Sequence, residues 1–301
     1  MSCMIGGCTQ TKHKHEYIYQ EFIEPTKSQQ GYDLYKCSCG KTKKVNKTGL
    51  INLPKDNNKP LNILFIGNSY TYYNELWNIF KDISISQGFD VKVDQVTNGG
   101  WSLAQMNDEN DTYGAKVKLK LQTNKYDFVF LQEMSMRPAN EPALFYDSVR
   151  SLSKKIKDTG ATPILYATWG RKAGNSALAV NNLTDYSMYQ KVISAYKAIG
   201  EELNIKVSYV GTAFYDVYKN NPAIDIYDED KTHPSLYGSY LAGMVHYATL
   251  FGLSPFGMNA KLIEKYEIQK VLEIAAHNAA FFGPKIEKQY ITSSIGVTTI
   301  K

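Results

Sequence analysis

A serine, a histidine and an aspartate stand at places in this sequence where they could carry out acyl transfer. Ser69 follows the apolar run Ile63–Ile66 and the pair Gly67-Asn68, which is typical of a buried strand that ends in a sharp turn. A serine hydroxyl becomes an effective nucleophile only when a base, usually histidine, accepts its proton. His233 is the candidate base, and Asp230 lies three residues before it, where one turn can bring the carboxylate to the ring. We predict Ser69 as nucleophile, His233 as base and Asp230 as the orienting acid.

Other interpretations of these residues stay open at this point. A Gly-Asn-Ser turn needs no chemistry, and residues 230–233 also fit a charged loop before a helix. Asp225 and Asp228 are alternatives to Asp230 as the orienting acid. His246 and His277 lie inside helical patterns, so we predict that they are ordinary helix residues.

Acyl transfer also needs hydrogen-bond donors that face the developing oxyanion, each of which contributes roughly 3–4 kcal/mol in other enzymes. The backbone N–H of Ser69 is one candidate. Gly100, in the pair Gly99-Gly100, is the second, because glycine lets the backbone approach a ligand closely. The side-chain amide of Gln132 is the third. A plain turn at the glycines and a structural glutamine are the alternatives.

Five apolar runs alternate with helical stretches and define the elements that must position these groups. The helical stretches include Ala143–Lys157 and Tyr186–Leu203, and a further helix is expected from Leu236 to Phe251. This alternation predicts an α/β fold, a three-layer α/β/α sandwich around a five-stranded parallel sheet. The predicted strands are Asn62–Ile66, Val91–Val96, Phe128–Leu131, Thr162–Ala167 and Lys206–Val210.

Right-handed crossovers place the carboxyl ends of all five strands at one edge of the sheet, where open α/β folds bind ligands. Ser69, Gly100 and Gln132 all follow strands, so they can converge although they are far apart in the sequence. Trp101, Trp169 and Arg171 belong to the same edge. We expect these three to line the substrate site, with packing and surface charge as the alternative.

The charge distribution argues against a nucleic-acid partner. The chain of 301 residues has a formal net charge of +5, but residues 1–60 hold 10 Lys and 5 acidic residues and account for all of it. The remaining 241 residues hold 24 basic and 24 acidic side chains. The main domain therefore has no basic field that could hold a polyanion. No apolar run is long enough to cross a bilayer, so no transmembrane segment is expected.

All four cysteines lie in the first 39 residues, in a segment predicted to form a small β-hairpin module. A two-stranded sheet has only marginal stability alone and needs a cross-link, a metal ion or a neighbouring element to stabilise it. Cys8, Cys37 and Cys39 with His15 or His13 would make a sulfur and nitrogen set suited to zinc. A disulfide from Cys8 to Cys37 or Cys39, or unpaired thiols, are the alternatives.

The boundaries follow from these patterns. We assign 1–48 to the Cys-containing module, 49–60 to a linker, 61–283 to the main domain and 284–301 to a C-terminal tail. The lysine-rich sequence from residue 41 to 60 has the composition of a solvated linker. The cysteine distribution favours a secreted or cell-surface protein over a cytoplasmic one. Met1–Cys8 has no basic region followed by an apolar one, so no complete signal peptide is visible.

Residues 61–253 resemble the SGNH (GDSL-like) hydrolase superfamily. Gly67-Asn68-Ser69-Tyr70-Thr71 is similar to its first block, with Asn68 where Asp is commoner, and Asn98-Gly99-Gly100-Trp101-Ser102 is similar to the second. Asp230-Lys231-Thr232-His233 matches the final Asp-x-x-His block. The Gly-x-Asn-Asp of the third block is absent, and Leu131-Gln132-Glu133-Met134-Ser135 stands there. Some carbohydrate esterases of the superfamily have Gln-Gly-Glu at this point, which implies Gln132 as the third donor, with Ser135 as the alternative.

The resemblance implies a flavodoxin-like SGNH fold, catalysis without a metal or organic cofactor, and hydrolysis of esters, often acetyl groups on carbohydrates. A lipase, a thioesterase and an acyltransferase are the alternatives among enzymes. A catalytically silent glycan- or surface-binding module is the alternative from another class. The N-terminal run of His-x-Tyr, Glu-Pro-Thr, Gly-Tyr and Tyr-x-Cys-x-Cys-Gly resembles small modules of secreted and surface proteins of gut Firmicutes. Those modules have Cys where this chain has Lys27.

Overall fold

The computed structural model describes residues 15–23, 31–48, 59–258, 263 and 265–284. The chain divides into two compact units, of which the first holds the described residues 15–48 and the second the described residues from 59 onward. Cys3, Cys8, His13 and the predicted C-terminal tail from 285 onward lie outside the described residues.

The first unit is a three-stranded antiparallel sheet in the order β1-β2-β3. Its strands are β1 (Tyr17–Ile23), β2 (Gly31–Cys37) and β3 (Thr42–Thr48). The predicted antiparallel pair is present as β1 and β2, in which Tyr17 pairs with Cys37. The prediction of a solvated linker from residue 41 is wrong for β3, because this lysine-rich segment pairs along β2.

The second unit contains a parallel sheet of five strands in the order β5-β4-β6-β7-β8. The predicted α/β fold with five parallel strands is confirmed, and each predicted strand agrees with the observed one to within two residues at either end. The strands are β4 (Leu61–Gly67), β5 (Val91–Thr97), β6 (Phe128–Leu131), β7 (Thr162–Tyr166) and β8 (Val207–Ser208).

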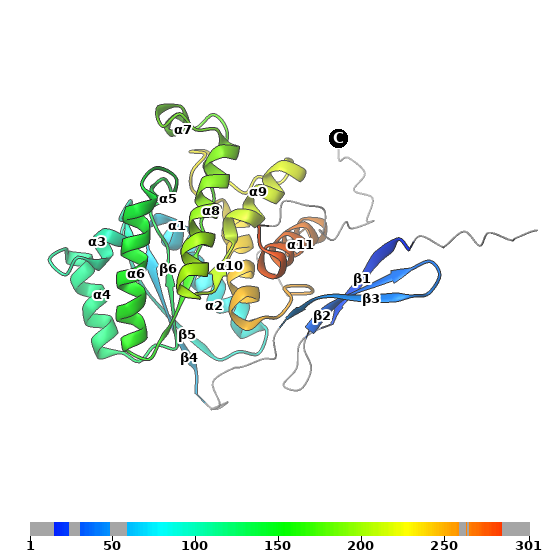
Figure 1. Cartoon of the computed structure of the whole chain (residues 1–301), viewed down its shortest axis with the longest axis horizontal. Coiled ribbons are helices and arrows are strands. Elements are labelled where there is room, and N and C mark those ends of the chain that lie inside the picture. The colour runs from blue at the N-terminus through cyan, green and yellow to red at the C-terminus, as the bar shows by residue number, and fades with distance from the viewer. Residues whose placement is uncertain (1–14, 24–30, 49–58, 259–262, 264, 285–301) are drawn as a thin grey trace, which may run out of the picture. The chain divides into compact units, whose positions relative to one another are not determined.

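Helices cover both faces of this sheet and complete the three layers (Figure 1). One face packs against α2 (Leu76–Ser86), α9 (Val210–Asn220), α10 (Leu236–Phe251) and α11 (Tyr266–Phe282). The other face packs against α3 (Leu103–Asn107), α4 (Thr112–Thr123), α6 (Pro142–Asp158) and α8 (Asp185–Leu203). The short helices are α1 (Ser69–Tyr72), η1 (Tyr73–Glu75), α5 (Arg137–Asn140) and α7 (Ser176–Val180).

Strand β4 shows why the sheet is buried on both faces. Ile63 and Phe65 point into the cluster beneath α2, α9, α10 and α11, whereas Leu64 and Ile66 point into the cluster on the opposite face. All four side chains are fully buried. Successive side chains of a strand point to opposite faces, so a central strand between two helical layers needs an unbroken apolar run.

The centre of the first face is a group of stacked aromatic rings. Phe130 of β6 lies parallel to Phe65 of β4, with 4.5 Å between the ring centroids, and Phe80 of α2 meets Phe130 edge to face at 5.9 Å. Rings packed this closely fix the separation of β4 and β6 from helix α2. The site residues that follow β4 and β6 therefore start from a rigid base.

Replacement of Phe130 tests the importance of this packing. Phe130→Ala removes a fully buried ring, and we expect a loss of about 3–5 kcal/mol in the free energy of unfolding, measured by urea titration. Leu119→Ala on α4 is the control, since this side chain is 58% exposed and its loss should cost less than about 0.5 kcal/mol. Equal unfolding midpoints for the two variants would contradict this account.

Candidate active site

Ser69 lies at the first position of helix α1, directly after β4 and the N-cap residue Asn68. The side chain of Asn68 accepts a hydrogen bond from the Tyr70 N–H at 3.1 Å, and its carbonyl accepts the N–H groups of Thr71 and Tyr72. The chain therefore turns within two residues, and the serine stands at the carboxyl edge of the sheet. It lines a pocket of about 450 Å³.

The loop between α9 and α10 brings His233 to this serine. His233 Nε2 lies 2.9 Å from Ser69 Oγ, and His233 Nδ1 lies 2.5 Å from Asp230 Oδ2. Ser69 and His233 are 164 positions apart in the sequence. The structure thus joins the predicted nucleophile, base and orienting acid in one line of hydrogen bonds.

Asp230 is held in its orientation by its own loop. Its Oδ1 atom accepts the backbone N–H groups of Thr232 at 2.9 Å and His233 at 2.8 Å, which leaves Oδ2 for the ring. Partial burial raises the pKa of Asp230, but the hydrogen bonds from the His233 ring and from these two N–H groups outweigh burial and lower it. The carboxylate therefore stays charged opposite the imidazole.

The two alternative acids have other partners. Asp225 accepts Lys172 Nζ at 2.9 Å, and Asp228 accepts the Tyr73 hydroxyl at 2.6 Å. Neither carboxylate is hydrogen-bonded to His233. Asp230 is thus the acid that faces the ring.

Ser69 and Gly100, the two predicted backbone donors, both line the pocket. Gly100 lines the pocket, and its φ of +75° is a backbone conformation that favours glycine. Ser69 occupies the first turn of α1, where N–H groups have no partner within the helix. Neither N–H is hydrogen-bonded to another part of the described chain. Both N–H groups are thus available as donors, and their role at an oxyanion stays a prediction.

Comparison with known proteins supports the fold of the large unit. No protein-family model and no curated protein matches the chain. A solved candidate SGNH hydrolase from Slackia heliotrinireducens matches with 29% identity and a TM-score of 0.57, over 62% of this chain and 97% of that one. A DUF4886 family protein from Bacteroides uniformis matches in fold, with 19% identity and a TM-score of 0.55, over 77% of this chain and 98% of that one. The large unit therefore has the fold of the SGNH hydrolases, and this likeness supports its assignment as a carboxylic ester hydrolase.

The third SGNH block is where the site departs from its prediction. Both N–H bonds of the Gln132 side chain are used inside the protein, one to Asn68 Oδ1 at 3.0 Å and one to the Glu133 carbonyl at 2.6 Å. Gln132 Oε1 accepts the Asn68 N–H at 2.8 Å and the Thr71 hydroxyl at 2.9 Å. The side chain is 1% exposed and does not line the pocket. The prediction that Gln132 donates to the oxyanion is wrong, because no donor remains.

Gln132 instead stabilises the turn that carries Ser69, through hydrogen bonds to the residues on either side of it. A Cβ atom on Gly67 would lie 2.4 Å from Gln132 Oε1, so only glycine permits this approach. Ser135, the alternative third donor, does line the pocket together with Met134. Its donor role stays a prediction.

Asn68 explains why an amide replaces the commoner SGNH acid at this position. Its Nδ2 atom donates to the Trp101 carbonyl at 2.8 Å, and its Oδ1 atom accepts from Tyr70 and Gln132. A carboxylate could accept those two hydrogen bonds but could not donate to Trp101. Asn68 thereby ties the serine turn to the loop that carries Gly100.

The predicted substrate-lining residues separate into three cases. Trp169 is fully buried between Tyr70 at 4.4 Å and Phe214 at 4.1 Å, so its prediction as a lining residue is wrong. Trp101 does not line the pocket either, and its ring nitrogen donates to Asp111 at 3.1 Å. Arg171 does line the pocket. The two tryptophans position loops rather than substrate.

Tyr73 is a site residue that the sequence reading missed. Its ring stacks on His233 with 4.6 Å between centroids and 16° between planes, while its hydroxyl is bound to Asp228. It stands four residues after Ser69, in a run of tyrosines that gives no signal of which ring faces the base. The stack confines the imidazole from one side.

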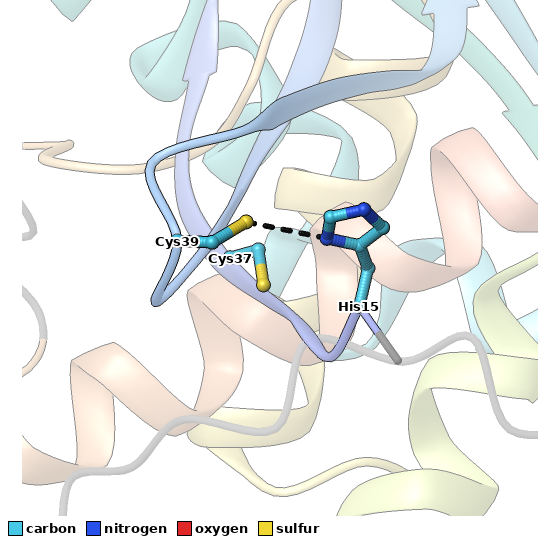
Figure 2. Close-up of side chains that lie close together, drawn as sticks. All are labelled: His15, Cys37 and Cys39. Atoms are coloured by element: carbon cyan, nitrogen blue, oxygen red, sulfur yellow. Dashed lines mark hydrogen bonds between the residues drawn. The ribbon is translucent and has the colours of Figure 1, made fainter. Parts of the chain in front are cut away.

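The N-terminal unit brings together three of the four predicted metal ligands. The ligand atoms of His15, Cys37 and Cys39 all lie within 4.8 Å of one another. Figure 2 shows these three side chains together. The fourth, Cys8, lies outside the described residues, so the predicted disulfide from it stays a prediction. None of the helices in the described part of the chain is long and apolar enough to cross a membrane.

Glu133 is a second missed residue, buried behind the loop that carries Gly100. Its Oε1 atom accepts the N–H groups of Leu103 at 3.1 Å and Met134 at 2.6 Å, whereas Oε2 is buried without a hydrogen bond. Burial penalises the charged form and raises the pKa of Glu133 to about 7. The carboxyl group joins the start of α3 to the loop after β6.

The raised pKa predicts a stability that depends on pH. Between pH 4.5 and about 7 the unfolded chain releases the Glu133 proton while the folded chain keeps it, so stability falls as pH rises. Glu133→Gln retains an oxygen acceptor but has no proton to release. We expect the free energy of unfolding of the parent, relative to this variant, to drop by about 3 kcal/mol between pH 4 and 8. A difference in urea titrations that does not change with pH would contradict this.

Proposed function

We propose that the large unit is a serine esterase that removes small acyl groups, in particular acetyl groups, from carbohydrates. The observation that carries the proposal is the hydrogen-bonded line from Ser69 through His233 to Asp230, at 2.9 and 2.5 Å, inside a pocket with uncommitted N–H groups. Nucleophile, base and orienting acid within hydrogen-bond reach are the geometric requirement for this chemistry.

The proposed reaction has two halves. Ser69 Oγ attacks the ester carbonyl carbon while His233 Nε2 takes its proton, and the negative oxygen lies between the N–H groups of Ser69 and Gly100. Asp230 stabilises the imidazolium through Nδ1. The alcohol leaves with the proton from His233, and the acyl group remains on Ser69. Water then attacks the acyl-enzyme with His233 again as base, which releases the carboxylic acid and restores the serine.

The pocket lining favours a polar substrate with a short acyl group. Only Tyr70 and Met134 bring large apolar side chains to it, and the other side chains are polar or absent. A lipase or long-chain thioesterase needs an extended apolar wall for the acyl chain. A small ester on a hydroxyl-rich alcohol suits this lining better.

Substitution of the nucleophile tests the proposal. Ser69→Ala should lower kcat/KM for p-nitrophenyl acetate by more than about 1,000-fold, and Asp230→Asn should lower it by a comparable factor, because the ring loses its orienting charge. Ser86→Ala is the matched control, since this hydroxyl caps the end of α2. Activity retained by pure Ser69→Ala protein would rule out the assignment.

The same assay with longer esters separates the rival enzymes. A site for acetyl groups should lose rate steeply from acetate to octanoate, whereas a lipase should gain. Release of acetate from a panel of acetylated glycans identifies the carbohydrate. Glycan binding without any acetate release would instead support a silent binding module.

A further inference from the structure

The N-terminal sheet gathers three soft metal ligands at one end. His15 precedes β1, Cys37 ends β2, and Cys39 stands in the turn before β3. Because Tyr17 pairs with Cys37, the start of β1 and the end of β2 lie side by side. His15 Nδ1 is 3.2 Å from Cys39 Sγ, and Figure 2 shows the Cys37 side chain beside this pair.

These positions fit one tetrahedral ion. Zinc binds thiolate sulfur at about 2.3 Å and imidazole nitrogen at about 2.0 Å, so two of its ligand atoms lie about 3.5 Å apart. The His15–Cys39 separation is already close to this value, and all three atoms fall within 4.8 Å. Small side-chain rotations would complete three corners of a tetrahedron.

The sheet itself gives a physical reason for such an ion. Among the described side chains of this unit, Cys37 is the one apolar group that is almost fully buried, at 2% exposure. With so little buried apolar surface among its described side chains, a sheet of three seven-residue strands gains little from a core, and small units of this kind use metals or disulfides. A bound ion would supply that stabilisation.

We propose that His15, Cys37 and Cys39 bind one zinc ion that stabilises the N-terminal sheet, with the fourth corner filled by a ligand from outside this trio. Both thiols bind as thiolates and release their protons on binding. None of these three residues is among those that line the proposed esterase pocket.

Metal analysis of the full chain tests this site. The protein as purified, after dialysis against a weak chelator, should contain about one zinc per chain by mass spectrometry. Cobalt exchanged into the site should give the charge-transfer absorption of cobalt–thiolate bonds. Cys39→Ser should lose both the zinc and this absorption, whereas Ser38→Ala, the matched control between the two cysteines, should keep them.

Three results would overturn the proposal. Parent protein that neither contains nor takes up zinc has no such site, whatever the folding of the variants. Cys39→Ser protein with the parent's zinc content would exclude this ligand set. A disulfide that involves Cys37 or Cys39 in freshly purified protein would show that a covalent cross-link, and not a metal ion, stabilises the sheet.

A separate observation concerns the charge of the substrate. The chain has three arginines, and two of them contact carboxylates: Arg137 with Glu141 at 3.2 Å and Arg150 with Glu202 at 2.7 Å. Arg171, which lines the pocket, has no carboxylate within ion-pair distance in the part of the chain that the structure describes. Its Nη1 atom donates to Thr232 Oγ1 at 2.8 Å, and its Nε atom is buried without a hydrogen bond.

An arginine that lines a pocket without a carboxylate partner can bind an anionic group of a substrate. Partial burial removes water from the guanidinium, and the cost is recovered when a carboxylate pairs with it. The terminal nitrogens of a guanidinium donate charge-assisted hydrogen bonds to a carboxylate. Asp230 is the one acidic side chain that lines the pocket, and its oxygens are taken up by N–H groups of Thr232 and His233.

We infer that the substrate is an acylated acidic sugar, whose carboxylate binds Arg171 while its ester reaches Ser69. This inference rests on the proposed esterase function and specifies its substrate class. Thr232 connects the two subsites, because it accepts from Arg171 and directly precedes His233.

Matched substrates test the inference. O-acetylated glucuronic acid and its neutral carboxamide differ only in charge, and parent protein should prefer the acid by at least about tenfold in kcat/KM. Arg171→Met should reduce this ratio to about one. Lys172→Met is the control, since this neighbouring cation pairs with Asp225 outside the pocket, and it should leave the ratio unchanged.

The outcomes separate this inference from the proposed function. A ratio of one in the parent, or the parent's ratio in Arg171→Met, overturns the anion subsite. Hydrolysis of p-nitrophenyl acetate without any release of acetate from either sugar also overturns it but leaves the esterase intact. Failure on p-nitrophenyl acetate as well would overturn the esterase itself.

Discussion

The position of Ser69 depends on the hydrogen bonds between the Gln132 side chain and Asn68, which pairs through its backbone N–H and its side-chain oxygen. These hydrogen bonds, of 2.8 and 3.0 Å in opposite directions, join the ends of β4 and β6 in a position that excludes water. Hydrogen bonds in such surroundings are strengthened by the low dielectric, and each unmade one is costly. Because Asn68 also holds the Trp101 carbonyl, the serine turn and the Gly100 loop share one rigid support.

The residues that position His233 come from different segments than those that position Ser69, and aromatic rings connect the two groups. Trp169 donates to the Thr232 carbonyl at 2.9 Å and packs against Tyr70, which follows the nucleophile. Tyr73 reaches over from the serine side, stacks on His233 and binds Asp228. The distance from Ser69 to His233 is therefore set by packed aromatic rings as well as by the hydrogen bond between them. Ring stacking positions His233 while both of its ring nitrogens stay available for Ser69 and Asp230.

The sequence predicted the features that depend on the hydrophobic pattern and on the order of strands and helices along the chain. An unbroken apolar run predicts a buried strand, and five such runs predict that Ser69 and the loops after the other strands converge. The role of Gln132 could not be predicted in this way, because it depends on whether its amide faces the pocket or Asn68, 64 positions away. Trp169 is buried by Phe214, a partner that no spacing reveals. Strand β3 was missed because its three lysines have the composition of a linker, although a strand at the edge of a small sheet tolerates them.

Thr232 shows how substrate recognition and catalysis can share one residue. Its hydroxyl oxygen accepts Arg171 and Asn175, each at 2.8 Å, its carbonyl accepts Trp169, and its N–H donates to Asp230. Thr232 therefore connects the Arg171 guanidinium to the peptide bond that precedes His233. A substrate anion that fixes Arg171 would also limit the positions open to the base, at a distance from the reacting atoms. Interactions of this kind contribute to kcat/KM when they hold the base in its reactive geometry in the transition state.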